Sequence, residues 1–366
     1  MRSAIQWMVG IGIGALFIFL SFREGQLDSL LAGSLHLDWS TGQLLSRENG
    51  DISWAVNLDA IAGYFACLVV IHGLRVWRWA PLLRPLVHVP AATLNRISAV
   101  GFMAVFLLPF RIGEAVRPWL LTREAPDVPF PSALATIVVE RIADGLTVTA
   151  LLFLSMLLLP EDFVLSRVVH VAGWSALAVF LTASVFIFLL HRSGEGFIQA
   201  VARLVGRIHT SGATRVERIL LGFRAGLASL PEWRANLSFL AITCCYWSLN
   251  GLGLQILSRG FGLEFPPSLC FIMMACVVVG MMIPNSPGNV GTYWYFLLLP
   301  LSGSSELMSL PAVTAFGLTA YSMQLLQQSS FGLVFVLRGK VRWKTLQEAT
   351  AADIPEEAGT QGTTAP

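Results

Sequence analysis

The chain alternates long apolar runs with short polar segments. A membrane-spanning helix needs about 20 apolar residues, and six runs come close to that length: 4–22, 58–74, 132–159, 171–190, 236–257 and 311–337. Two more apolar stretches, about 97–124 and 268–301, are interrupted by proline and glycine. Such breaks occur at membrane depth only where the backbone is buried in protein or lines a cavity. The pattern therefore predicts an all-α polytopic membrane protein with about six full spans and two re-entrant helical hairpins.

Composition supports this class. Hydrophobic residues make up 55% of the 366 positions and charged residues 13%, with a mean hydropathy of +0.68, whereas soluble domains carry about 25% charge. A water-soluble globular protein is excluded. The five cysteines all lie in apolar runs without a CxxC pair, so neither a disulfide framework nor a zinc site is expected. The sequence predicts no metal, no cofactor and no nucleic-acid partner, and leaves the oligomeric state open.

The placement of charge predicts the orientation. Segments 75–131 and 191–234 each hold seven arginines against three acidic residues, whereas 23–57 is acidic. By the positive-inside rule, both termini are expected in the cytoplasm. Arginine outnumbers lysine 22 to 2, which indicates a GC-rich bacterial genome, so the chain is expected in the bacterial inner membrane. The segments expected outside are 23–57, 160–170, 258–267 and 302–310. This assignment requires hairpins that enter from opposite sides, as an inverted repeat would produce.

These boundaries give a domain plan. Residues 1–22 are expected to form a retained N-terminal anchor helix, because no small-residue cleavage site follows Phe22. An outer loop over 23–57 precedes the membrane domain, 58–337, which contains an amphipathic cytoplasmic connector at 191–234. The tail, 338–366, is basic at first and then has the composition of a disordered segment.

The first candidate binding site lies at the turn of the first hairpin. Gly113 permits a tight turn, and a helix that begins after it would point its positive dipole end toward the membrane centre. Glu114 suits the first turn of that helix, while Arg111 and Arg117 add two positive charges. An anionic group such as a lipid phosphate fits this arrangement. The alternative is a cytoplasmic loop whose arginines only set the topology.

A second candidate site is the charged triplet Glu140, Arg141 and Asp144 inside a predicted span. At 1.5 Å per residue these charges lie roughly 12–18 Å deep, where charges are costly. Glu140 and Asp144 share one helix face, and Arg111 or Arg117 could balance the excess acid. The triplet is either an ion-pair clasp or a proton or headgroup relay. Gln324, Gln327 and Gln328 in the last span are interpreted as interhelical hydrogen-bonding residues.

A third candidate site is the break in the second hairpin, where proline removes donors and glycine opens the backbone to a ligand. Its expected binding residues are Pro284, Asn285, Ser286, Pro287, Gly288, Gly291 and Thr292. The alternative is a kinked helix with satisfied buried polar groups. The heptapeptides at 107–113 and 282–288 share the pattern apolar-apolar-Pro-x-x-x-Gly, which gives weak support to the repeat.

Four segments in order resemble the membrane module of lysylphosphatidylglycerol synthase, a flippase-like family also called UPF0104. They are RVWRWAPLLRP (75–85), LLPFRIGEAVRPWLL (107–121), VVERIADG (138–145) and IPNSPGNVG (283–291). The resemblance implies a stand-alone module, without the soluble aminoacyl-transferase domain, that moves an anionic or lipid-linked substrate between leaflets.

Two alternatives to the transporter stay open. One is a membrane-embedded glycosyl- or acyl-type transferase acting on a lipid carrier, although no catalytic motif is recognisable. The other is a non-transporting scaffold for a lipid-biosynthesis enzyme. We expect no catalytic residues, and the identity of the lipid lies beyond the sequence.

Overall fold

A computed structural model of the chain describes residues 2–22, 34–49, 51–108, 113–161, 163, 165–192, 194–207, 210–228, 233–282 and 286–339. Its long helices are α1 (Arg2–Phe22), α3 (Leu58–Trp77), α7 (Phe130–Leu157), α8 (Arg167–Arg192), α11 (Trp233–Gly260) and α15 (Pro311–Leu337). Each covers one predicted span, so the helical character of the membrane region is confirmed. Among the described residues, three stretches have the length and apolarity to cross a bilayer, namely Leu58–Leu83, Arg167–Arg192 and Trp233–Gly260. The full number of spans stays a prediction.

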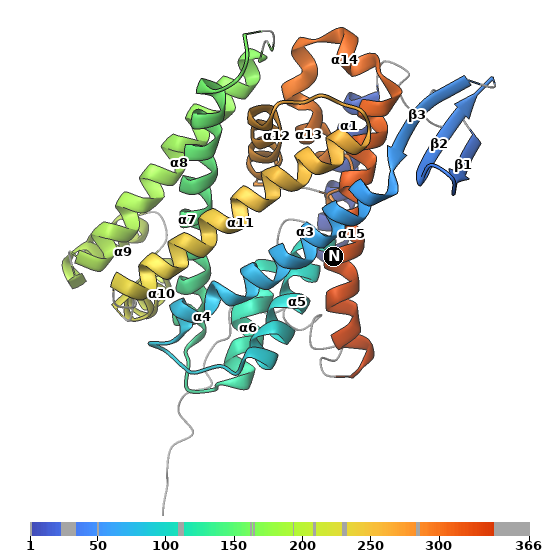
Figure 1. Cartoon of the computed structure of the whole chain (residues 1–366). Coiled ribbons are helices and arrows are strands. Elements are labelled where there is room, and N and C mark those ends of the chain that lie inside the picture. The colour runs from blue at the N-terminus through green and yellow to red at the C-terminus, as the bar shows by residue number, and fades with distance from the viewer. Residues whose placement is uncertain are drawn as a thin grey trace, which may run out of the picture.

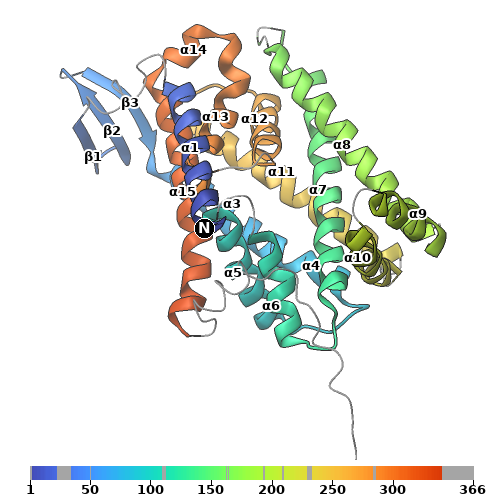
Figure 2. The same cartoon turned by 180° about the vertical axis from the view of Figure 1, so that it is seen from behind.

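The long helices enclose the centre of the molecule. Helices α7 and α8 run along one flank and α15 along the other, while α3 and α11 pack together and cross between them (Figures 1 and 2). The largest group of buried apolar side chains comes mainly from α3, α11, α12 (Pro267–Gly280) and α15. A second group joins the end of α3 to α4 (Trp79–Leu83), α5 (Ala91–Leu107), α6 (Val116–Glu124) and α7.

Both predicted hairpins are helix–break–helix units. Helices α5 and α6 form the first, and α12 and α13 (Thr292–Leu298) form the second, whose break includes the short 3-10 helix η2 (Pro287–Asn289). Helix α5 packs against both α6 and η2, so the second break adjoins the first hairpin. The chain then continues through η3 (Leu299–Gly303) and α14 (Ser305–Ser309). Whether these hairpins re-enter the bilayer, and with opposite sense, stays a prediction.

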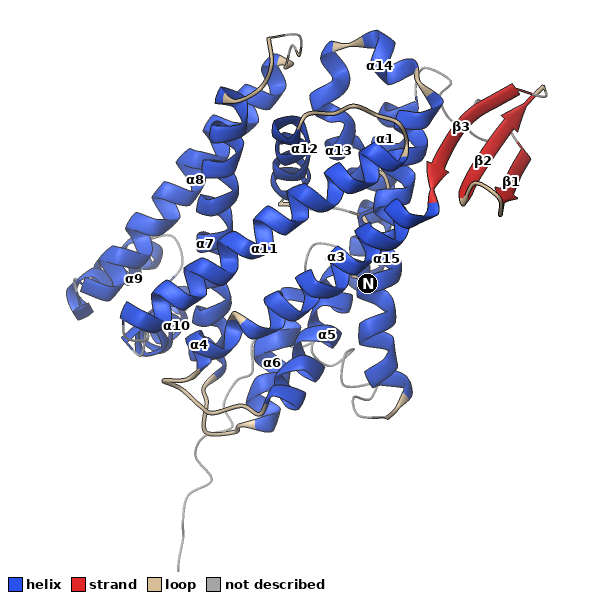
Figure 3. Cartoon of the chain, viewed as in Figure 1, coloured by secondary structure: helices blue, strands red, loops and turns tan. Residues whose placement is uncertain are grey.

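An antiparallel sheet occupies much of the predicted outer loop, which corrects the all-α expectation for this segment. Strands β1 (Ser34–Asp38), β2 (Gln43–Glu48) and β3 (Asp51–Asn57) pair in chain order, and the sheet projects beyond the helices (Figure 3). In the β1–β2 turn, the hydroxyl and backbone N–H of Ser40 donate to Asp38 Oδ1 over 2.6 and 2.9 Å. These hydrogen bonds lower the pKa of the exposed Asp38 carboxyl to about 2. Two signals for a hairpin were present in the sequence: apolar and polar residues alternate along the strands, and Asn49-Gly50 stands between β2 and β3.

The amphipathic connector forms α9 (Gly194–Gly206) and α10 (Thr210–Ala228). Their apolar side chains join α7 and α8 in a third buried group, which includes Ile198, Phe223 and Leu227. The hydroxyl of Ser132 on α7 donates to the carbonyl of Gly222 on α10 over 3.0 Å. Part of the apolar surface of the connector therefore packs against protein.

Candidate functional site

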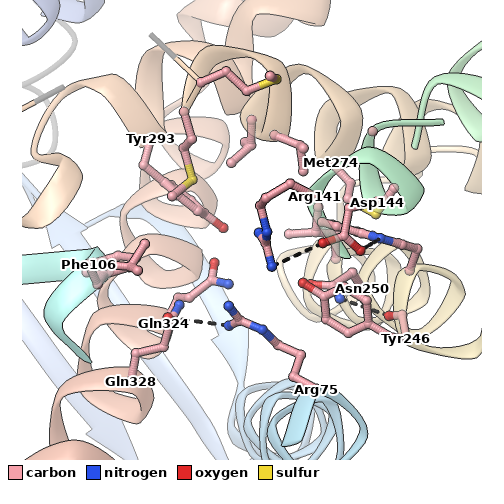
Figure 4. A pocket seen from close by; sticks show the side chains of 18 of the residues that line it. Arg75, Phe106, Arg141, Asp144, Tyr246, Asn250, Met274, Tyr293, Gln324 and Gln328 are labelled. Carbon is pink, nitrogen blue, oxygen red and sulfur yellow. Dashed lines mark hydrogen bonds and ion pairs between the residues drawn. The ribbon is translucent and has the colours of Figure 1, made fainter. Parts of the chain in front are cut away.

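A cavity of about 240 Å³ with polar and apolar lining lies between α3, α7, α8, α11, α15 and the two hairpins. Helices α3, α7, α11 and α15 contribute its polar wall, and α5, α8 and α12 contribute mainly apolar side chains (Figure 4). The charged and polar lining groups are Tyr64, Arg75, Glu114, Arg141, Asp144, Tyr246, Asn250, Tyr293, Gln324 and Gln328. Burying so many polar groups between apolar helices costs free energy unless they form hydrogen bonds or ion pairs with one another or with a ligand.

A buried ion network lies against this cavity, with Glu140 on α7 at its centre. Glu140 Oε1 accepts from Arg78 over 2.9 Å, from Arg117 over 3.0 Å and from Arg141 over 2.6 Å. Arg117 also donates to Glu140 Oε2 over 3.2 Å, which makes the pair bidentate. The side chains of Arg78 and Glu140 have no exposed surface, so this charge balance is made within the protein.

Asp144, one turn further along α7, carries the second half of the network. Arg78 donates to both of its carboxylate oxygens, and Arg141 pairs with Asp144 Oδ2 over 3.2 Å. The indole N–H of Trp247 on α11 adds a donor to Oδ1 over 2.9 Å. Arg78 therefore links Glu140 and Asp144, and ties the end of α3 to the middle of α7.

Aromatic rings cover the flat faces of the arginines. The guanidinium carbon of Arg117 lies 4.2 Å from the ring centre of Trp79, and that of Arg78 lies 4.7 Å from Tyr246. Such stacking suits guanidinium, which is planar and weakly hydrated. Carboxylates satisfy the edges of these groups and rings cover their faces, so arginine can be buried here.

Two glycines make room for this arrangement. A Cβ at Gly101 on α5 would lie 2.2 Å from Cγ of Arg117, so the absence of a side chain there admits the arginine stem. A Cβ at Gly113 would lie 2.2 Å from the backbone of Ala104. Gly113, in the turn between the helices of the first hairpin, is therefore in direct contact with the backbone of α5. This contact positions Glu114 and Arg117, which follow Gly113 in the chain.

Arg75 differs from the other three arginines of the site. Its guanidinium stacks on Phe102, with 3.7 Å from its carbon to the ring centre, and donates one long hydrogen bond of 3.5 Å to Gln328 on α15. No carboxylate in the described part of the chain pairs with it, and its buried Nε has no hydrogen-bond partner there. Arg75 extends from α3 into the same cavity as Arg141 (Figure 4).

The second hairpin break is ordered by its own contacts. The Ser286 hydroxyl donates to the Val290 carbonyl over 2.7 Å, and the Tyr321 hydroxyl donates to the Gly288 carbonyl over 2.9 Å. Gly288 has a φ of +70°, a conformation that glycine adopts readily. The break is thereby fixed to α15 next to the cavity.

The sequence-predicted binding residues fall into four groups. Glu114, Arg141 and Asp144 line the cavity. Arg117 and Glu140 lie beside it in the ion network, and Gly113 packs against α5. The hairpin residues Ser286, Pro287, Gly288, Gly291 and Thr292 are not among the described residues that line the cavity. Arg111, Pro284 and Asn285 lie outside the described residues.

Sequence reasoning missed the contributions of α3, α11 and α15. Arg75 and Arg78 served only in the resemblance, because arginines at the end of a span also satisfy the positive-inside rule. Their i,i+3 spacing was the available signal. Gln324 and Gln328, one helical turn apart, were interpreted as interhelical hydrogen-bonding residues, and no local pattern marks Tyr246 or Trp247 as residues that line the same cavity.

The fold and the site define a helical membrane protein with a buried ion network beside a polar cavity. Residues 7–327 match the family model described as the lysylphosphatidylglycerol synthase TM region, and the chain belongs to this family. It is also similar to glycosyltransferase AglD of Haloferax volcanii, with 22% identity over 259 residues. That match covers 64% of this chain but 41% of the relative, so the chain spans about two fifths of its length. No solved structure is significantly similar to the chain. These relationships support a membrane, lipid-related function.

Proposed function

We propose that this protein binds the headgroup of an anionic or lipid-linked substrate in the central cavity and moves it between the leaflets of the membrane. The observation that carries the proposal is the cavity between apolar helices, whose lining includes the charged side chains of Arg75, Arg141, Glu114 and Asp144. A cavity of about 240 Å³ has room for a headgroup. The chains would stay in the bilayer while the protein replaces the water lost by the headgroup.

The ion network supports a positioning role for the two buried carboxylates. Glu140 accepts from three arginines and Asp144 from two arginines and an indole. A proton relay needs a carboxylate that exchanges protons, whereas these two are held by permanent cations. The geometry therefore favours the clasp over the relay, with Glu140 and Asp144 holding the arginines in place.

Transport is tested with the purified chain in liposomes that contain a fluorescent phosphatidylglycerol. Dithionite, added outside, reduces only dye that reaches the outer leaflet. We expect nearly complete bleaching in proteoliposomes and incomplete bleaching in protein-free liposomes. Bleaching that matches protein-free liposomes, with correctly folded and inserted protein, would contradict transport of this lipid class.

The similarity to a protein named as a glycosyltransferase gives a second candidate, transfer of a sugar to a lipid carrier. Its test is incubation of the reconstituted chain with labelled nucleotide sugars and a polyprenyl phosphate, followed by extraction into organic solvent. Label in the extract would favour the transferase. We rank transport first, because arginines already engage both carboxylates of the network.

A further inference from the structure

The three-stranded sheet has one apolar and one polar face. Strand register places alternate residues on the same face, and over the length of β1 the apolar face carries Leu35, Leu37, Leu44, Ser46, Trp54 and Val56. Polar side chains occupy the other face, where the Gln43 amide donates to the side-chain oxygen of Asn57 over 2.8 Å. The sheet is therefore amphipathic, like a sheet that packs one face against an apolar surface.

The helices cover the apolar face on the side of β3. Val56 has only 1% of its surface exposed, and the ring centre of Trp54 lies 5.9 Å from that of Phe261, the residue after α11. Strand β3 contacts α3 and α15, whereas β1 is the outermost strand (Figure 1). The apolar face thus extends from the core of the protein out to the edge of the sheet.

Exposed apolar side chains follow the outermost strand at every second residue. Leu35 and Leu37 on β1 are 64% and 41% exposed, and Trp39, in the β1–β2 turn, is 82% exposed. We call Leu35, Leu37 and Trp39 the apolar edge. Single exposed apolar residues are common on protein surfaces, but a continuous set of them marks a contact with another protein or with a membrane.

The position of the β1–β2 turn favours the membrane. The Gly42 carbonyl of this turn accepts the N–H of Leu58, the first residue of α3, over 2.9 Å. Leu58–Leu83 has the length and apolarity to cross a bilayer, so the turn lies level with the start of that stretch. Tryptophan is enriched at this boundary, because its ring is apolar and its N–H is polar.

We infer that the apolar edge inserts into the surface of the leaflet beside it and holds the sheet against the membrane. The polar face of the sheet stays in water. Unpaired backbone groups of a sheet edge are too costly to bury in hydrocarbon, so only the side chains enter, at the boundary between headgroups and acyl chains. The apolar edge has no basic side chain, so the contact does not require anionic lipids. This surface lies outside the central cavity, and the inference does not depend on the proposed function.

The test compares two neighbouring exposed positions that lie on opposite faces of β1. In a full-length variant without the five native cysteines, Leu37→Cys or His36→Cys carries a bimane fluorophore, and the protein is reconstituted into phosphatidylcholine liposomes. Iodide, present on both sides, quenches the label from water. A phosphatidylcholine with a nitroxide near the top of its acyl chain quenches it from the bilayer. We expect lipid quenching to dominate at position 37 and iodide quenching at position 36.

Each alternative gives its own pattern. Iodide quenching at both positions without lipid quenching would show that the sheet stands clear of the bilayer. Protection of position 37 from both quenchers would show that protein covers the apolar edge, for example a second copy of the chain paired along β1. Lipid quenching that appears only when phosphatidylglycerol is added would show an electrostatic contact. Any of these three results would overturn the inference.

A second variant assigns the contact to Trp39. With the label at position 37, Trp39→Ser should lower lipid quenching and raise iodide quenching, because the largest apolar side chain of the edge is lost. The matched control is Trp77→Ser, at a tryptophan that is 69% exposed in the last turn of α3, and it should leave both values unchanged. Wild-type quenching in a monodisperse Trp39→Ser protein would overturn the role of Trp39.

Discussion

At the residue scale, every cation of the ion network is arginine. Arg117 donates two parallel bonds to one carboxylate, a geometry that the planar guanidinium permits and a lysine ammonium does not, and Arg78 contacts both carboxylates at once. Ring faces of Tyr246 and Trp79 complete the surroundings of these two groups. The network is therefore specified by the shape of the cation as well as by its charge.

Glu140→Gln should destabilise the protein strongly. The change removes the charge shared by Arg78, Arg117 and Arg141 and leaves guanidinium groups buried without compensation. Breaking a buried ion pair in this way costs about 3–5 kcal/mol. We expect a markedly lower melting temperature in detergent, measured by size-exclusion chromatography of heated samples.

Glu306→Gln is the matched control, since Glu306 is exposed on α14. Its melting temperature should equal that of wild type. Equal melting of Glu140→Gln and Glu306→Gln would show that the network contributes little to stability.

At the element scale, α1 docks on the second hairpin through close backbone contact. Gly291 has a φ of +77°, and a Cβ there would lie 2.7 Å from the Gly14 carbonyl oxygen and 2.8 Å from the Ile18 nitrogen. A Cβ at Gly14 would in turn lie 2.7 Å from Cβ of Ser286. Both surfaces of this contact therefore depend on glycine.

Gly291→Ala should loosen α1 from the hairpin. Alanine at positive φ costs roughly 1–2 kcal/mol, and the overlap with α1 adds about 1–3 kcal/mol. Gly42→Ala separates the two effects, because Gly42 has a φ of +66° with open space around it. We expect faster hydrogen exchange across α1 in the Gly291 variant alone. The same exchange in both variants would contradict the docking.

The long helices and the charged triplet on α7 were predictable because hydrophobic periodicity and charges within an apolar run are local signals. The partners of that triplet were not. Arg78 lies 62 residues before Glu140, and Trp247 lies 103 residues after Asp144, so only the packing of α3 and α11 on α7 reveals them. The sheet was missed for a different reason: its short strands carried an Asn-Gly turn signal in a segment interpreted as loop.

At the scale of the whole molecule, segments of opposite charge character lie at opposite ends. In Figure 1 the sheet, the α7–α8 connection and α14 lie toward the upper end, and α4, α6 and the end of α15 lie toward the lower end. These are the segments that the positive-inside rule assigns to the two sides of the membrane. The arrangement is compatible with a cytoplasmic lower end.

Thiol labelling tests this orientation. In a variant without the five native cysteines, Thr41→Cys in the β1–β2 turn should react with a membrane-impermeant maleimide in intact cells. Gln199→Cys on α9, which is equally exposed in the fold, should react only after the membrane is opened. The reverse pattern would invert the topology.

The junction between the sheet and α3 has a mechanical consequence. Strand β3 ends at Asn57 and α3 begins at Leu58, whose N–H donates to the Gly42 carbonyl in the β1–β2 turn over 2.9 Å. From there a single helix, about 30 Å long at 1.5 Å per residue, leads to Arg75 and, just past its end, Arg78. Because α3 connects the sheet directly to these two arginines, a tilt of the sheet would be transmitted along the helix to Arg75 in the cavity wall and to Arg78 in the ion network.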